Sequence, residues 1–136
     1  MKELSGKTAL VTGSTDGVGR LVARKLGQAG ARVLVHGRDG ERGARVVADI
    51  EASGSGADFL AADLSALAEV RRLADTAQAT VERLDILINN AGIGTAGPRE
   101  TSAEGFELRF AVNYLAGFLL TLLLLPLSRT ARQRGS

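Results

Sequence analysis

A glycine-rich turn between an apolar run and an amphipathic run constrains this chain more than any other feature of its sequence. Residues 8–12 are apolar enough for a buried strand, and helical spacing of apolar side chains begins at Val18 and continues to Ala29. Gly30 then predicts the end of that helix. The turn between the strand and the helix consists of Gly13, Ser14, Thr15, Asp16, Gly17, Val18 and Gly19.

Spaced glycines in such a turn predict a phosphate-binding site. Glycine lets the backbone approach a phosphate closely, and it lets the helix pack tightly on the strand. Unpaired N–H groups at the start of the helix then face the phosphates, and the helix dipole favours their negative charge. The turn is not a P-loop, because no Gly-Lys-Ser/Thr follows it. The alternative is a glycine-rich turn that binds no ligand.

Strand and helix patterns alternate along the rest of the chain. Apolar runs predict strands at 8–12, 32–36, 58–62 and 85–89. Helical spacing predicts helices at 17–29 and 40–52, a third capped by Ser65, and a long one at about 103–125. The strands are apolar throughout rather than alternating, which is typical of a parallel sheet with helices on both faces.

These elements predict an α/β fold with a doubly wound, Rossmann-type parallel sheet in the order 3-2-1-4. The pattern stops after the fourth strand and the long helix that follows it, so we expect a truncated version of that fold. We expect one domain over residues 1–127 and a polar, frayed tail over residues 128–136.

Composition excludes several classes of protein. The 136 residues are 45% hydrophobic and 24% charged, with 17 Lys and Arg against 15 Asp and Glu, so no basic stripe for nucleic acid is expected. The chain has no cysteine and one histidine, which argues against a thiolate or multi-histidine metal site. The apolar run at 118–127 is too short for a membrane span, which takes about 20 residues. Since the N-terminus has no apolar signal core, we expect a cytoplasmic protein.

The turn and three further motifs resemble the short-chain dehydrogenase/reductase family. The spacing Gly-x-x-x-Gly-x-Gly after Thr12 is similar to the family's first signature. In the family's order, the chain then carries Asp63-Leu64 after the third strand, Asn89-Asn90-Ala91-Gly92 after the fourth strand, and Phe110-Ala111-Val112-Asn113 in the long helix. The four matches cover nearly the whole chain.

The resemblance implies a nicotinamide dinucleotide as ligand and gives each motif a role. Asp63-Leu64 would hold the adenine ring, and Asn90-Ala91-Gly92 would line a ribose of the cofactor. Asn113 would be a member of the family's catalytic tetrad, where this residue holds a water in a proton relay. Taken singly, each position also has a structural explanation: a helix cap for Asp63, turn formation for the asparagines, and a core amide for Asn113.

The residues after the second strand bear on the choice between NADP and NAD. An acid at this strand end binds the ribose of NAD, and relatives that use NAD usually carry it where Gly37 stands. Arg38 follows instead, as in many relatives that use NADP, and a guanidinium can pair two oxygens of the 2′-phosphate. We therefore expect NADP. NAD remains the alternative if Arg38 is simply solvated or if Asp39 binds the ribose hydroxyls.

The rest of the family's catalytic tetrad has no match in this sequence. The family reduces carbonyls or oxidises alcohols with a Ser and a Tyr-x-x-x-Lys, in which the Lys lowers the pKa of the Tyr. The single tyrosine, Tyr114, has Phe118 where the Lys would be, and no lysine follows Lys25. We therefore expect the NADP(H)-binding part of an enzyme whose parent acts on a small carbonyl or alcohol. The alternative is an inactive nucleotide-binding or assembly module, or a truncated gene product.

Two further expectations concern the branch of the family and self-association. Residues 112–121 resemble the retinol-dehydrogenase-like branch. In the family, however, substrate contacts come largely from the half of the protein that this sequence does not contain.

The long apolar helix and an exposed fourth strand predict a homo-oligomer or aggregation, because an uncovered apolar sheet edge pairs with other edges.

Overall fold

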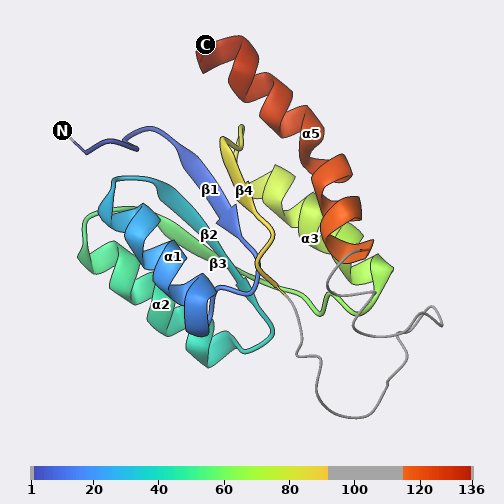
Figure 1. Cartoon of the computed structure of the whole chain (residues 1–136), viewed down its shortest axis with the longest axis horizontal. Helices are drawn as coiled ribbons and strands as arrows, with labels where there is room; N and C mark the ends of the chain where they lie inside the picture. Colours follow the sequence, from blue (N-terminus) through green and yellow to red (C-terminus); the bar gives the residue numbers. More distant parts are fainter. Residues whose placement is uncertain (1, 92–114, 136) are drawn as a thin grey trace.

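The backbone forms one parallel sheet whose strands run in the order predicted from the sequence (Figure 1). The structure is a computed structural model that describes residues 2–91 and 115–135, with only the backbone from residue 128 onward. Its strands are β1 (Thr8–Val11), β2 (Arg32–Gly37), β3 (Ala57–Ala61) and β4 (Ile86–Ile88). They pair in parallel in the order β3-β2-β1-β4, which confirms the doubly wound arrangement.

Helices cover both faces of this sheet (Figure 1). α1 (Gly17–Gln28) and α2 (Gly40–Ala52) lie on one face. α3 (Leu67–Thr80) and α5 (Ala116–Gly135) lie on the other, so the sheet is the middle layer of three.

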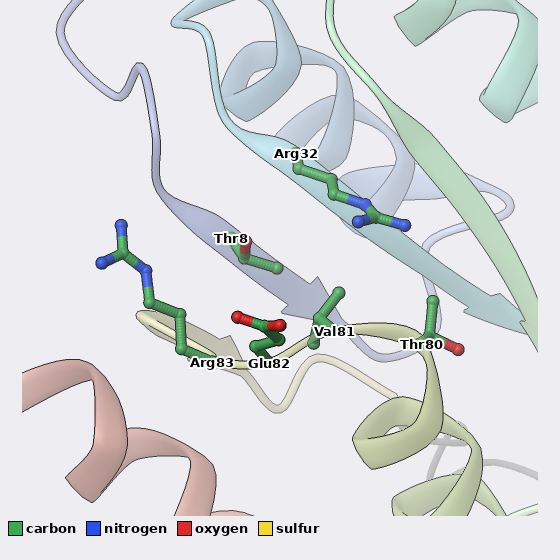
Figure 2. A pocket seen from close by; sticks show the side chains of 6 residues that line it. All are labelled: Thr8, Arg32, Thr80, Val81, Glu82 and Arg83. Carbon is green, nitrogen blue, oxygen red and sulfur yellow. The ribbon is translucent and has the colours of Figure 1, made fainter. Parts of the chain in front are cut away.

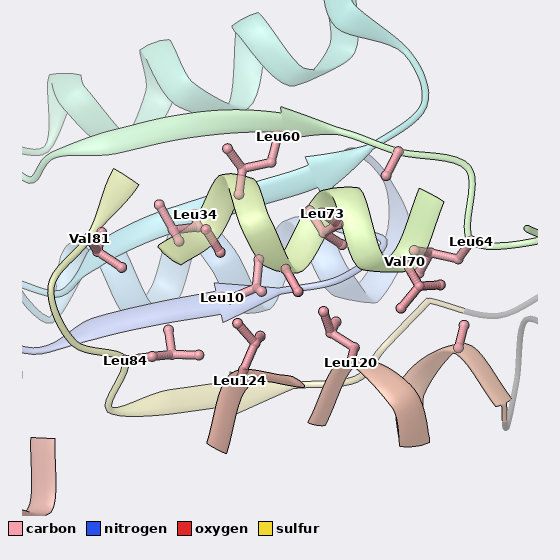
Figure 3. Packing of buried hydrophobic residues seen from close by; sticks show 14 residues of the cluster. Leu10, Leu34, Leu60, Leu64, Val70, Leu73, Val81, Leu84, Leu120 and Leu124 are labelled. Carbon is pink, nitrogen blue, oxygen red and sulfur yellow. The ribbon is translucent and has the colours of Figure 1, made fainter. Parts of the chain in front are cut away.

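Alternate residues of the central strands enter two separate cores. Leu10 and Leu34 pack with Leu73, Leu120 and other side chains of α3 and α5, as Figure 3 shows. The valines that alternate with them in β1 and β2 pack on the opposite face, against α1 and α2. Because these strands are buried on both sides, their sequences are apolar throughout.

The face that α1 turns to the sheet agrees only in part with its apolar spacing. Val22 and Leu26 pack against the core, whereas Val18 and Leu21 are 69% and 56% exposed. The buried positions are Gly19, Ala23 and Gly27, each four residues apart. A Cβ on Gly27 would lie 2.8 Å from a side chain of α2. Close packing therefore favours small residues on this face, which a search for large apolar side chains overlooks.

The start of α3 also differs from the prediction. Its N-cap is Ala66, which makes no side-chain hydrogen bond, so the expected cap at Ser65 is wrong. Instead, a carboxylate oxygen of Asp63 accepts the backbone N–H of Ser65 at 3.0 Å. This turn at the end of β3 leads the chain into the helix.

α5 is longer than predicted. Its backbone stays helical through Pro126 to Gly135, although the sequence predicts an end near residue 125 and a frayed tail. Leu120 and Leu124 are buried, whereas Phe118 is 67% exposed, so the helix has one open face. Residues 103–114 of the predicted helix lie outside the described residues. In the described ranges, no helix is long and apolar enough to cross a membrane.

Candidate dinucleotide-binding site

The segments that follow the four strands lie together at one edge of the sheet. Parallel strands end on the same side, so this edge carries the glycine turn after β1, Arg38 after β2, Asp63-Leu64 after β3 and Asn90-Ala91 after β4. Open α/β sheets bind their ligands at such an edge. Two predicted site residues, Gly92 and Asn113, lie outside the described residues.

The glycines of the turn meet different requirements. Gly13 and Gly17 have φ angles of 61° and 54°, a backbone region that glycine enters without steric cost. A Cβ on Gly19 would collide with the carbonyl oxygen of Gly13 and the side-chain amide of Asn90, so only glycine lets α1 begin this close to the sheet. A Cβ on Gly17 would meet nothing within 4 Å, which leaves open space at the start of the helix.

The first turn of α1 offers unpaired N–H groups. No hydrogen bond within the described part of the chain uses the backbone N–H of Gly17, Val18 or Gly19. Asp16 is the N-cap, but its carboxylate makes no capping bond and instead accepts from Arg42 at 3.2 Å. The open space, the free N–H groups and the helix dipole together fit a phosphate group.

Ser14 and Thr15 hold the turn against β2. Ser14 is fully buried; its Oγ accepts the N–H of His36 at 2.9 Å, and its own N–H donates to the carbonyl oxygen of His36 at 2.8 Å. Thr15 lies over Gly37, where a Cβ would be 2.5 Å from Thr15 Cγ2. Both side chains therefore contact the protein itself, and they shape the turn.

His36, near the end of β2, ties the same turn to β3. Its side chain is 3% exposed. Nδ1 accepts the N–H of Gly13 at 2.9 Å, and Nε2 lies 3.0 Å from the carbonyl oxygen of Ala62. Burial lowers the pKa of His36 below its ordinary value, although the hydrogen bond to Ala62 works in the opposite direction. A neutral imidazole therefore links the ends of three strands.

Thr12 and Asn90 join the turn to the end of β4. The Thr12 hydroxyl is buried and accepts the N–H groups of Asn90 and Ala91, each at 3.0 Å. The side-chain amide of Asn90 donates to the carbonyl oxygen of Gly13 at 3.1 Å. The amide of Asn89 donates instead to a threonine hydroxyl of α5 at 3.0 Å. The two asparagines thus have separate tasks, one at the turn and one at α5.

Arg38 and Asp63 are electrostatic neighbours at the ends of β2 and β3. The hydrogen bond from the Ser65 N–H lowers the pKa of Asp63 most, and the positive charge of Arg38 lowers it further. Arg38 is exposed and forms no hydrogen bond or close ion pair with the residues that the structure describes. A guanidinium in this state can take a phosphate. Leu64, by contrast, is buried in the core, so only its backbone faces this edge.

Asp39 caps α2, which argues against the alternative in which it binds ribose hydroxyls. Its Oδ1 accepts the backbone N–H groups of Glu41 and Arg42 at 2.9 and 3.3 Å. The Arg42 guanidinium lies 3.6 Å from the second oxygen. Both carboxylate oxygens are engaged, so Arg38 is the better candidate to meet a ligand at this strand end.

Three residues that shape the site were not predicted as site residues: Thr12, His36 and Arg42. The apolar pattern places Thr12 in the strand, but its position directly before a glycine turn indicates that its hydroxyl could bond a neighbouring strand. His36 is a polar residue at the end of an apolar run, which indicates a buried partner. Arg42 gave no signal, because its contact with Asp16 joins two distant segments.

A pocket of about 520 Å³ lies away from these residues, at the amino ends of the strands (Figure 2). Its lining includes Arg32 and Arg83. Arg32 already pairs with Asp58 at 2.6 Å, and Arg83 lies 3.5 Å from Asp85. None of the predicted site residues lines this pocket, so it does not bear on the site at the opposite edge.

Comparison with known proteins gives the same picture. A family model described as short chain dehydrogenase matches residues 7–136. The chain is 47% identical to polyprenol dehydrogenase of Mus musculus and 43% identical to dehydrogenase/reductase SDR family member 13 of Homo sapiens. These alignments cover 96% and 93% of this chain but 39% and 33% of the relatives. Retinol dehydrogenase 12 of Bos taurus is 40% identical over 90% of this chain and 39% of its own length. The chain thus spans well under half the length of these relatives.

Solved structures show the same fold. The RhlG/NADP active-site complex of Pseudomonas aeruginosa matches with a TM-score of 0.81 and 39% identity, over 94% of this chain and 50% of that one. A metagenomic short-chain oxidoreductase in complex with NADP matches with a TM-score of 0.84 and 38% identity, over 97% and 60%.

Proposed function

Since this chain belongs to the short-chain dehydrogenase family, we propose that it is the NADP-binding part of an oxidoreductase. The observation that carries the proposal is the glycine turn, whose open space and unpaired N–H groups share a sheet edge with Arg38. The NADP complexes among its structural relatives support the same ligand.

The start of α1 would hold the pyrophosphate. The backbone N–H groups of Gly17, Val18 and Gly19 would donate to it, and the helix dipole would favour its charge. Gly17 has no side chain to fill the space that the phosphates need. The Arg42 contact partly neutralises Asp16, which would otherwise repel the phosphates.

Arg38 would select NADP over NAD. A guanidinium without a close partner in the described residues can bind the 2′-phosphate through two hydrogen bonds. No acid competes for the ribose at this point, because Gly37 carries no side chain and the Asp39 carboxylate caps α2. The cofactor preference therefore depends on Arg38.

The ends of β3 and β4 would hold the adenosine and the second ribose. Asp63 lies beside Arg38 and would meet the adenine ring, together with the backbone of Leu64. Asn90 and Ala91 lie against the first glycine of the turn and would line the ribose. Gly92 would extend that surface.

In the longer protein, we propose hydride exchange with a small carbonyl or alcohol, and the nicotinamide would supply or accept the hydride. Residues of this chain would bind and orient the cofactor, and Asn113 would hold the relay water that the resemblance implies. The sequence contains no Tyr-x-x-x-Lys to act as the acid. A nucleotide-binding module without activity is the second candidate.

Calorimetric titration of the purified chain with NADP and with NAD tests the proposal. We expect tighter binding of NADP, and we expect Arg38→Asp to weaken NADP by about 10- to 100-fold through the lost charged hydrogen bonds. NAD binding should stay equal or improve. Lys25→Glu makes the same change of charge near the far end of α1 and should leave both affinities near the wild-type values. Equal affinity of the wild type for NADP and NAD would refute the role of Arg38.

A further inference from the structure

His36 occupies a position in which only one protonation state and one tautomer satisfy its neighbours. Nε2 lies 3.0 Å from the carbonyl oxygen of Ala62, and a carbonyl can only accept, so Nε2 carries the proton. Nδ1 accepts the N–H of Gly13 at 2.9 Å, so Nδ1 carries none. The neutral Nε2–H imidazole meets both partners.

The backbone of His36 reinforces the hold on the same segment. Its N–H donates to Ser14 Oγ at 2.9 Å, and its carbonyl oxygen accepts the Ser14 N–H at 2.8 Å. Gly13 and Ser14 open the glycine turn, and both are therefore fixed by a single residue of β2. Gly13 has a φ angle of 61°, and these hydrogen bonds help to maintain that backbone conformation.

A second proton on His36 would break the arrangement. Nδ1–H and the Gly13 N–H would then be two donors facing each other, and one of them would have to move away. The ring is buried, so little solvent is available to stabilise its charge or the donor that faces the Gly13 N–H. Burial accordingly lowers the pKa of His36.

No acidic group among the described residues pairs with the ring. The charged groups on the surrounding elements belong to the turn, the end of β2, the start of α2 and the end of β3. They engage other partners or solvent rather than His36, and they are Asp16, Arg38, Asp39, Glu41, Arg42 and Asp63. A charge on the imidazole would therefore remain without a counter-ion.

We propose that His36 is a positioning residue whose neutral Nε2–H form sets the conformation of the glycine turn, so that dinucleotide affinity falls when His36 is protonated. The effect on affinity rests on the proposed function, whereas the effect on the turn does not. His36 would not touch the ligand; it would act through Gly13 and Ser14.

NMR of the chain without ligand tests the turn. His36 is the only histidine, so its ring signals are assigned without ambiguity. Ring ¹⁵N shifts should show the Nε2–H tautomer at neutral pH, and the ring should titrate below its ordinary value of 6.5. The amide signals of Gly13 and Ser14 should move with the same midpoint. An Nδ1–H tautomer, or a Gly13 amide that ignores the titration of the ring, would overturn the proposal.

Three substitutions test the link to binding. His36→Asn keeps an acceptor near the place of Nδ1, His36→Gln keeps a donor near the place of Nε2, and His36→Leu keeps neither. We expect NADP to bind about tenfold more weakly to the Gln and Leu variants, whose Gly13 N–H is unpaired, and to lose clearly less in the Asn variant. A purely structural role predicts instead that affinity follows the unfolding free energies of the variants, which urea titration measures.

The pH profile completes the test. The 2′-phosphate also titrates near pH 6, but it does so equally for every variant. As the pH falls from 7.5 through the ring midpoint that NMR gives, the wild type should therefore lose more affinity than the Asn and Leu variants. The proposal would be overturned if NADP affinity had the same pH dependence in the wild type and these variants. It would also be overturned if His36→Gln bound NADP as tightly as His36→Asn. A wild type that binds no dinucleotide at pH 7.5 would refute the proposed function, and the NMR titration would still decide whether His36 sets the turn.

Discussion

Thr15 occupies the space that a side chain at Gly37 would need. A Cβ built on Gly37 would lie 2.5 Å from Thr15 Cγ2 and 2.8 Å from its Oγ1. Gly37 is the position at which an acid would favour NAD, and Thr15 belongs to the turn that would hold the pyrophosphate. The turn and the choice of cofactor are thus sterically coupled in this chain.

We expect Gly37→Asp alone to be a poor route to NAD specificity. The new side chain must displace Thr15, at a cost of about 1–3 kcal/mol in the free energy of unfolding. Thr15→Ala should recover part of that loss in the double variant, because it removes the two closest atoms. Urea unfolding of the wild type, the two single variants and the double variant measures the coupling. Additive effects of the two substitutions would mean that the Thr15 side chain moves aside without cost.

Thr12→Val should destabilise the chain although it preserves shape. The hydroxyl accepts two N–H groups at the end of β4, and its loss should cost about 1–3 kcal/mol of unfolding free energy. Thr76→Val is the matched control, because the Thr76 hydroxyl donates to a carbonyl of its own helix, and the change should alter stability by less than about 0.5 kcal/mol. Urea titration compares them, and equal stability of both variants would remove Thr12 from this role.

The chain should self-associate at micromolar concentration. β4 is an apolar strand at the edge of the sheet, and Phe118 and Leu122 are exposed on α5. Light scattering should detect dimers or larger species, and a Phe118→Glu, Leu122→Glu double variant should shift them towards monomer. Leu21→Glu changes an exposed apolar residue of α1 and serves as control. A wild type that is monomeric throughout would contradict the expectation.

These 136 residues alone should not turn over substrate. An alkoxide formed by hydride transfer needs a positioned acid, and the sequence has no Tyr-x-x-x-Lys to provide one. Consumption of NADPH should therefore stay near the background rate with aldehydes, ketones and quinones. Tyr114→Phe is the decisive comparison, because Tyr114 is the only tyrosine. Repeated turnover that disappears in this variant would identify Tyr114 as a catalytic acid and contradict the expectation.

The sheet could be predicted because burial on both faces leaves a direct trace in sequence. Continuous apolar runs gave the four strands and, with right-handed crossovers, their order. Apolar spacing identifies only part of the buried face of α1, namely Val22 and Leu26. That face is set by how closely Gly19 approaches the Gly13 carbonyl, and a glycine carries no hydrophobic signal.

The outline of the site was predictable, but its internal bonds were not. Spaced glycines and Arg38 identify a phosphate edge from sequence alone. The contacts of His36 join residues 23 and 26 positions apart, and no local pattern shows which strand ends will meet. Asp39 is a second example. From sequence, an acid at that position could cap α2 or bind a ribose, and only its hydrogen bonds to the N–H groups of Glu41 and Arg42 show that it caps the helix.

The most direct measurement is calorimetric titration of NADP into the wild-type chain, Gly17→Val and Gly6→Val. Gly17 and Gly6 both have positive φ and open space around a built Cβ, so valine should strain both backbones alike. Gly6 precedes β1, at the opposite end of that strand from the turn. We predict one site per chain in the wild type and in Gly6→Val, and affinity at least about tenfold weaker in Gly17→Val. Absence of binding by the wild type, or equal affinity of all three proteins, would contradict a dinucleotide site at this turn.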